Sequence, residues 1–140
     1  MKKIILAAFM AACGLQMSAQ QNLFVAQDLE SAIVNKDNTV TFNFKAPDAQ
    51  KVQIAGDFAE KAEGQHIGGM VGAGLIDMTK NSEGIWTYTT KPLDSELYSY
   101  EFMVDGVPTI DPNNVYVYRD FATTSNVFIV GNGKADLYKV

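Results

Sequence analysis

The sequence predicts an all-β domain, an antiparallel β-sandwich of about seven short strands. Apolar and polar residues alternate in several short runs, as they do on strands with one buried face, and turn-forming residues separate these runs. No long segment shows the helical period. The chain has 140 residues, 47% of them apolar, with eight Phe, six Tyr and one Trp, which suits one domain with a substantial core.

Period-two alternation predicts strands at residues 39–45, 51–55, 84–89, 97–104, 107–110, 125–130 and 135–140. Pro47 stops the first strand because proline cannot donate a ladder hydrogen bond. Asp105-Gly106 predicts a type I′ hairpin, since glycine accepts a positive φ, and Pro108 places the strand after it at a sheet edge. The last predicted strand reaches Val140 without a terminating signal, so we expect a further domain after it.

Residues 57–80 show no clean period, and five glycines predict a long flexible loop with a short helical turn at 60–63. Loops of this length in compact domains are often functional, but a mobile insertion has the same composition. Both interpretations remain open.

The first 19 residues have the organisation of a secretory signal peptide. Lys2 and Lys3 precede an apolar run that is too short to span a bilayer, and Ser18-Ala19 supplies small residues for cleavage. We therefore expect residues 1–19 to be removed after Ala19 and the protein to be periplasmic or secreted. Residues 20–36 then form a leader segment, and residues 37–140 form the β-sandwich.

Cys13 allows an alternative, lipid attachment at a loose lipoprotein motif, although a cysteine within a signal is also a simple apolar residue. Cleavage after Ala19 leaves no cysteine and therefore no disulfide. It also changes the net charge from −5 to −7 by removing two lysines. An acidic domain without a basic cluster argues against nucleic acid and anionic lipid as partners, but does not exclude neutral sugars.

The sequence offers little catalytic chemistry. Its one histidine, His66, lies in the glycine-rich segment, and no serine lies in a Gly-x-Ser-x-Gly motif, so we expect no catalytic residue. One histidine and scattered carboxylates do not make a zinc site, and the acidic residues of 57–63 do not match a calcium loop. The sequence therefore predicts neither a metal site nor a cofactor.

Binding of a neutral sugar needs exposed aromatic rings together with amides or acids that hydrogen-bond its hydroxyls. Trp86, Tyr98 and Tyr100 lie in alternating strands, and we expect them in the core. Tyr116 and Tyr118 share one face of a short segment and are the candidates for a surface site.

An ordered set of short motifs carries a family resemblance. The motifs are Val52–Phe58, Gly84–Trp86, Tyr98–Gly106, Asp111-Pro112 and Ser125–Val130. Together they resemble the family-48 carbohydrate-binding modules, which are early-set immunoglobulin-like domains, over roughly residues 37–131. Asn126 matches a sugar-contacting asparagine of that family. The aromatic platforms of its starch-binding members are missing, however, because Ala59 and Val107 stand where tryptophans are expected and Glu101 replaces a lysine.

Within this family the chain looks most like the N-terminal module of secreted bacterial esterases that act on plant polysaccharides, including feruloyl esterases. The glycine-rich insertion after Asp57-Phe58 and the segment 111–120 suggest this branch. The resemblance implies a non-catalytic accessory module that binds xylan-like polysaccharide or packs on a downstream esterase domain, with Asn126, Tyr116 and Tyr118 as carbohydrate-binding residues. The alternative is a free-standing exported β-sandwich that binds another protein and no sugar.

Overall fold

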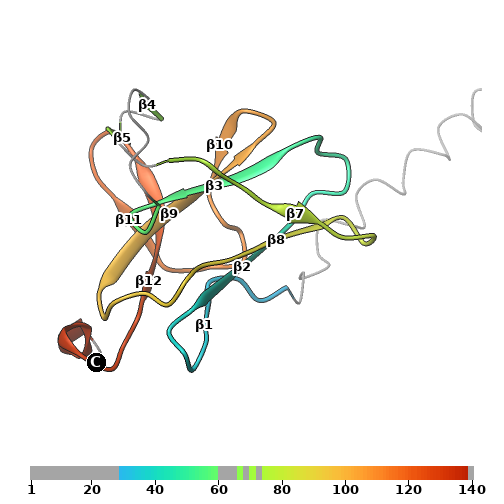
Figure 1. Ribbon diagram of the computed structural model, residues 1–140. Coiled ribbons are helices and arrows are strands. Elements are labelled where there is room, and N and C mark those ends of the chain that lie inside the picture. Colours follow the sequence, from blue (N-terminus) through green and yellow to red (C-terminus); the bar gives the residue numbers. More distant parts are fainter. Residues whose placement is uncertain (1–28, 60–65, 68–69, 72–73, 139–140) are drawn as a thin grey trace, which may run out of the picture.

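The computed structural model describes residues 29–59, 66–67, 70–71 and 74–138. Two antiparallel sheets pack face to face in this part of the chain (Figure 1), which confirms the predicted all-β sandwich. The elements are β1 (Ile33–Val34), β2 (Val40–Lys45), β3 (Val52–Gly56), β4 (His66–Ile67), β5 (Met70–Val71), β6 (Ile76–Asp77), β7 (Thr79–Lys80), β8 (Ile85–Thr89), β9 (Leu97–Val104), β10 (Val107–Thr109), β11 (Val117–Arg119), β12 (Thr124–Ile129) and the 3₁₀ helix η3 (Lys134–Tyr138).

The first sheet has the strand order β1-β2-β8-β7. Its β2 strand buries Val40, Phe42 and Phe44, as the alternation predicts, because every second side chain of a strand faces the same side. Trp86 of β8 lies opposite Phe44, is buried, and donates a hydrogen bond from its Nε1 to the Ala46 carbonyl at 2.9 Å. Its predicted place in the core is confirmed.

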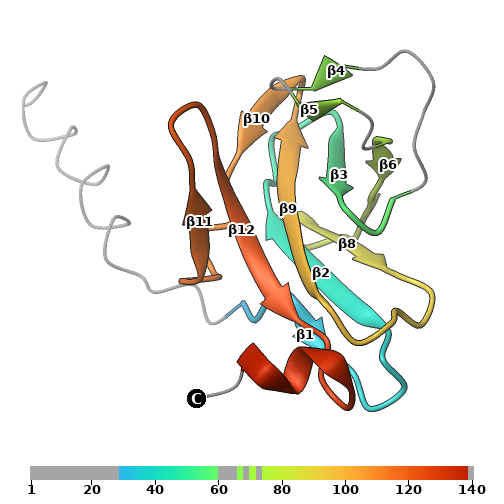
Figure 2. The ribbon, with the colours of Figure 1, turned by 90° about the vertical axis from the view of Figure 1, so that its left-hand side faces the viewer.

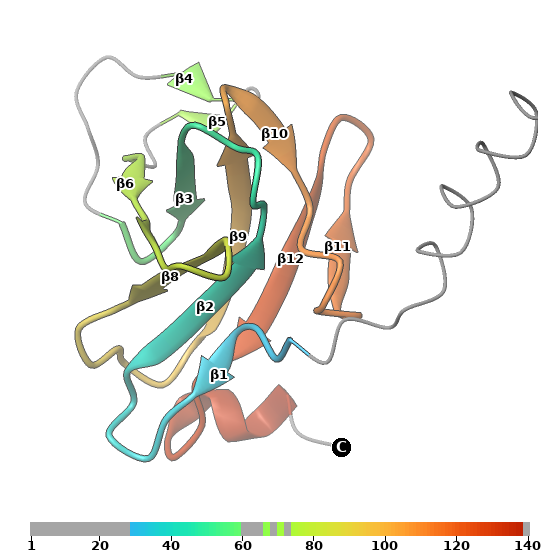
Figure 3. The same cartoon turned by 90° about the vertical axis from the view of Figure 1, so that its right-hand side faces the viewer.

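The second sheet has the order β11-β12-β9-β3-β6, and β10 also pairs with β9 (Figure 3). The long central strand β9 turns Tyr100 and Phe102 toward the first sheet. The ring of Phe42, from the opposite sheet, lies 4.8 Å from that of Tyr100 and 5.5 Å from that of Phe128 between centroids. Aromatic contacts across the two sheets therefore make up the centre of the core.

The predicted hairpin at Asp105-Gly106 is confirmed. Both residues have positive φ, 48° and 84°, as a type I′ turn requires. The Asp105 carboxylate accepts hydrogen bonds from the backbone N–H groups of Gln50 and Lys51 at 3.0 and 2.7 Å, which ties the turn to the start of β3. Within the described residues β10 pairs with β9 alone, so Pro108 does lie in an edge strand.

The prediction of a loop throughout residues 57–80 is wrong in part, because β4 pairs with β5 and two further strands follow. β6 adds to the edge of β3, where Ile76 lies opposite Ile54, and β7 adds to β8. Between them Met78 is buried and donates its backbone N–H to the Val52 carbonyl at 3.0 Å. Two-residue strands are too short to show alternation, and for this reason the sequence did not reveal them. The helical turn expected at 60–63 lies outside the described residues.

The strand expected at 135–140 is also wrong, because residues 134–138 form η3 at the end of the sandwich (Figure 2). Asn132 takes a positive φ of 65° and turns the chain after β12. The Asp136 carboxylate accepts the N–H groups of Asn132 and Gly133 at 3.1 and 3.2 Å, and Ala135 is fully buried. Hydrogen bonds from one side chain thus outweigh a weak alternating pattern.

Seven of the observed strands have three or more residues, which agrees with the number expected, but β11 takes the place of 135–140. Ile33–Val34, from the leader segment, form β1 and pair with β2. The predicted signal peptide, including Cys13, lies outside the described residues. In the part of the chain that the structure describes, no helix is long and apolar enough to cross a membrane.

Candidate functional site

Two tyrosines stand out on the surface of the second sheet. Tyr116, just before β11, is 71% exposed, and Tyr118, within β11, is 60% exposed. They are two residues apart on an extended segment, so their side chains leave the same face of the sheet about 7 Å apart. We call this pair the aromatic strip.

The register of the sheet places polar groups on the same face as the aromatic strip. Tyr116 lies opposite Val127 of β12, whose N–H donates to the Tyr116 carbonyl at 3.0 Å, and Val127 lies opposite Ser99 of β9. Directly opposite residues of an antiparallel pair share a face. Ser99, and Glu101 two residues further along β9, therefore lie on the outer face, while Tyr100 between them is buried.

These polar groups differ in their contacts. Ser99 donates from its N–H and its hydroxyl to one carboxylate oxygen of Asp57, at 2.8 and 2.7 Å. Glu101 is half-buried, and burial raises the pKa of its carboxyl above the ordinary value. Glu101 lies on the same sheet face as the exposed aromatic rings but two strands from them, about 10 Å away. Its half-buried carboxyl can offer hydrogen bonds to hydroxyl groups of a ligand that extends across β12.

A buried polar network of Tyr100, Asp111, Asn114 and Asn126 lies behind the strip. The Tyr100 hydroxyl donates to Asp111 Oδ2 at 2.7 Å and accepts from Asn114 Nδ2 at 3.1 Å. Burial, with the nearby charge of Asp111, raises the pKa of the Tyr100 hydroxyl far above its ordinary value. Within a buried site such a satisfied network fixes the geometry of the segment that carries it.

Asn126 belongs to this network and not to the surface. Its side chain is fully buried, its Oδ1 accepts the N–H of Asp111 at 2.6 Å, and its Nδ2 donates to the carbonyls of Asp111 and Asn114 at 3.3 and 3.0 Å. Its amide groups are therefore used within the protein and do not reach a ligand in this conformation. Of the three predicted binding residues, the structure brings together Tyr116 and Tyr118 and places Asn126 beneath them.

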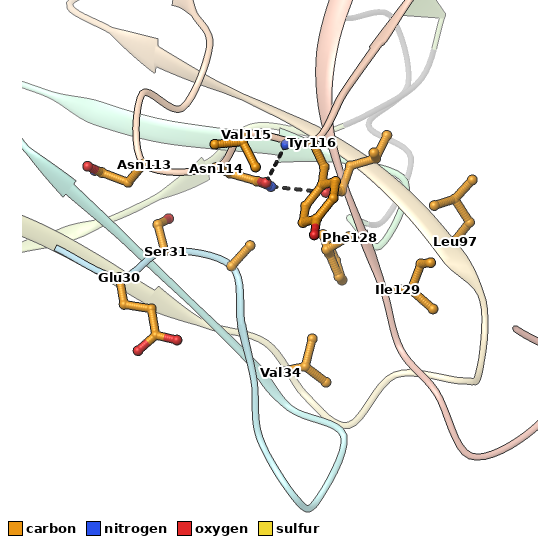
Figure 4. A pocket seen from close by; sticks show the side chains of 12 residues that line it. Glu30, Ser31, Val34, Leu97, Asn113, Asn114, Val115, Tyr116, Phe128 and Ile129 are labelled. Carbon is orange, nitrogen blue, oxygen red and sulfur yellow. Dashed lines mark hydrogen bonds between the residues drawn. The ribbon is translucent and has the colours of Figure 1, made fainter. Parts of the chain in front are cut away.

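Asn114 connects the network to the aromatic strip. Its Oδ1 accepts the N–H of Tyr116 at 2.9 Å, and its Nδ2 donates to the Val127 carbonyl at 2.9 Å (Figure 4). The side-chain amide thus takes the place of a direct ladder bond between Tyr116 and Val127. The position of Tyr116 is therefore set by the buried residues and not only by its own strand.

An apolar cleft of about 510 Å³ opens beside Tyr116 (Figure 4). It lies along the part of β12 that β11 does not cover, opposite β1, and its lining includes Val34, Leu97, Ile129 and the ring of Tyr116. Glu30 and Ser31 also line this cleft. Tyr116 therefore belongs to the aromatic strip and also lines a cleft that can take an apolar group.

The remaining candidates fall elsewhere. Tyr100 is in the core as predicted, and Tyr98 is partly buried against it. His66 lies in β4, and no group of three metal-ligating side chains is present among the described residues. The prediction overlooked Glu101 and Ser99 as site residues, although the alternation of 97–104 already places them on the face opposite Tyr100.

The comparisons with known proteins identify the fold only. A scan against models of protein families finds no match, and neither does a search of curated proteins. Among solved structures, the chain is similar to the group B Streptococcus pullulanase SAP, with a TM-score of 0.52 and 16% identity over 76% of this chain. The same pullulanase in complex with maltotetraose gives a TM-score of 0.52 at 17% identity over 76% of this chain.

The chain matches only 15% of the length of these pullulanases. At this identity the similarity establishes a shared fold, a β-sandwich that also occurs as one part of these much longer pullulanase chains. It does not by itself transfer their activity to this chain.

Proposed function

We propose that this β-sandwich is a non-catalytic carbohydrate-binding module that binds polysaccharide on the outer face of its second sheet. Tyr116 and Tyr118 provide the apolar surface that covers the C–H face of a pyranose ring. Glu101 provides a hydrogen-bonding carboxyl on the same face. Asn126 has a positioning role in this proposal, because it holds the turn that precedes Tyr116.

The observation that carries the proposal is the pairing of two exposed tyrosines with a half-buried carboxyl on one sheet face. Exposed aromatic rings at adjacent positions of a face are costly in water and are usually found where a ligand covers them. The fold shared with part of a pullulanase solved with maltotetraose supports a carbohydrate as this ligand.

The host and the polymer are further parts of the proposal. The esterase-type motifs of the sequence favour a module that assists a polysaccharide-acting esterase, with xylan-type chains as the polymer. The signal-like residues 1–19 favour export. The net charge of −5 accords with a neutral polymer better than with an acidic one.

The test is a pull-down of the purified protein with insoluble xylan, starch and cellulose, followed by calorimetry with soluble oligosaccharides. We expect retention on xylan, and Tyr116→Ala and Tyr118→Ala should each weaken binding by about tenfold, as the loss of a ring stacked on a sugar implies. Tyr138→Ala is the matched control, because Tyr138 is 54% exposed but lies in η3, away from the strip.

Retention that both strip variants leave unchanged would move the site elsewhere on the protein. Retention on starch alone would support a carbohydrate-binding module but show that its polymer is starch and not xylan. If no polymer is retained, the proposal is wrong, and the alternative of a module that packs against another protein takes its place.

A further inference from the structure

In the part of the chain that the structure describes, the second sheet ends at β11. This strand is the last of its sheet, and within the described residues it pairs only with β12 (Figure 2). The backbone of Tyr116 and of Asp120 bonds toward β12 and its turn, through Val127 N–H and Thr123 carbonyl. Because backbone groups alternate in direction along a strand, those of Val117 and Arg119 point away from the sheet.

The same hairpin exposes several large apolar side chains. Phe121 is 104% exposed and Val115 84%, in the same segment of the chain as the two tyrosines of the strip. Taking about 200 Å² for a fully exposed aromatic side chain, the three rings alone leave about 450 Å² in water. Apolar patches of this order on a monomer are often functional, and a standard interface buries about 800 Å² per partner. Pairing of two such hairpins along β11 can therefore bury part of the area that a stable dimer needs.

We propose that β11 is a homodimerisation edge, where two copies pair antiparallel around a two-fold axis that passes beside Tyr118. In this register Val117 of one copy lies opposite Arg119 of the other, and both residues present outward N–H and C=O groups. Four backbone hydrogen bonds then join two sheets into one. This inference does not depend on sugar binding.

The side chains favour this register over the one centred on Arg119. The two copies of Tyr118 meet at the axis as a non-hydrogen-bonded pair, the position where side chains are closest, and Phe121 lies opposite Val115. The aliphatic stem of Arg119 covers Val117. A shift of the axis to Arg119 would place two positive charges opposite each other, which is unfavourable.

The first test is disulfide formation in the full chain with Cys13→Ser, so that an introduced cysteine is the only one. We expect Tyr118→Cys to form a covalent dimer under mild oxidation, because a pair on the axis brings the two Cβ atoms within about 5.5 Å. Val117→Cys is the register control, since it faces Arg119 and not itself. Val107→Cys is the surface control, because Val107 is 62% exposed on the separate edge strand β10.

The second test is sedimentation equilibrium over a wide concentration range. We expect a monomer–dimer equilibrium that Val117→Pro weakens by about tenfold or more, because proline removes an outward N–H in each copy and leaves the bonds to β12 in place. A protein that stays monomeric, or a dimer that is unaffected by Val117→Pro, would overturn the proposal. So would cross-linking of Tyr118→Cys that is no faster than that of Val107→Cys.

Discussion

The hydroxyl of Tyr100 donates a 2.7 Å hydrogen bond to the carboxylate of Asp111, and both side chains are at least 98% buried. The two residues come from different parts of the chain, Tyr100 from the centre of β9 and Asp111 from the turn before β11. Their contact joins the core of the sandwich to the segment that carries the exposed tyrosines.

Tyr100→Phe should destabilise the domain by about 2 kcal/mol. The substitution keeps the ring and its packing but leaves a buried carboxylate oxygen without its donor, and hydrogen bonds to charged groups contribute about 1.5–3 kcal/mol. The measurement is urea unfolding, where the midpoint should fall at an unchanged m value. Tyr138→Phe removes an exposed hydroxyl and should leave the midpoint where it is. Equal midpoints for wild type and Tyr100→Phe would contradict the role given to this bond.

The free energy of unfolding should decrease above about pH 10, and Tyr100→Phe should reduce that decrease. Burial raises the pKa of Tyr100 in the folded protein above its ordinary value of 10.0. Above pH 10 the unfolded chain therefore loses the Tyr100 proton while the folded protein retains it, and stability is lost as the pH rises. One such proton contributes a slope of up to about 1.4 kcal/mol per pH unit. The measurement is the free energy of unfolding of wild type and Tyr100→Phe as a function of pH. If it falls equally steeply in both proteins between pH 10 and 11, the prediction is wrong.

Asn114→Ala should remove the hydrogen bond that holds the backbone N–H of Tyr116, without unfolding the domain. The Tyr116 N–H donates only to Asn114 Oδ1 among the hydrogen bonds described above, so its exchange with solvent deuterium should accelerate by about tenfold or more. Asn113→Ala is the matched control, because its Nδ2 has no hydrogen-bond partner among the described residues. If Tyr116 exchanges at the same rate in both variants, the buried network does not position the strip.

Two glycines with positive φ should respond differently to alanine. At Gly106 an added Cβ meets no atom within 4 Å, so Gly106→Ala should cost only the backbone strain, about 1 kcal/mol. At Gly84 it would come within 2.6 Å of both Cα and Cβ of Pro47, and overpacking adds at least about 1 kcal/mol. Gly84→Ala should therefore have a lower thermal unfolding midpoint than Gly106→Ala. The reverse order would argue against this packing of β8 on the Pro47 turn.

Alternation predicts the long strands of this fold well, since Val40, Phe42 and Phe44 have to share one buried face. It fails where hydrogen bonds from single side chains decide the conformation, as Asp136 does for η3. The prediction of Asn126 as a carbohydrate-binding residue, which the structure buries, fails for another reason. The sequence shows that an asparagine lies in a strand, but not whether its amide is satisfied by a turn that is 15 residues away.

Local patterns in the sequence likewise predict only part of the candidate site. Two tyrosines at positions i and i+2 necessarily share a face, so Tyr116 and Tyr118 could be found from their spacing. The strand that lies beside them, and hence the presence of Glu101 on their face, depends on the order β11-β12-β9, which local patterns do not encode.

The pairing of β2 with β8 has a consequence for how fast the chain folds. Thr41 and Thr89, partners in that ladder, are 48 residues apart in sequence, and β3 and β9 enclose a loop of similar length. The chain loses the entropy of closing such a long loop before any stabilising contact between the strands has formed. For this reason β-sandwiches refold in milliseconds to seconds. The fluorescence of Trp86 should follow the pairing of β2 with β8 directly. Trp86 lies in β8 opposite Phe44 of β2, and its side chain becomes buried when the two strands pair.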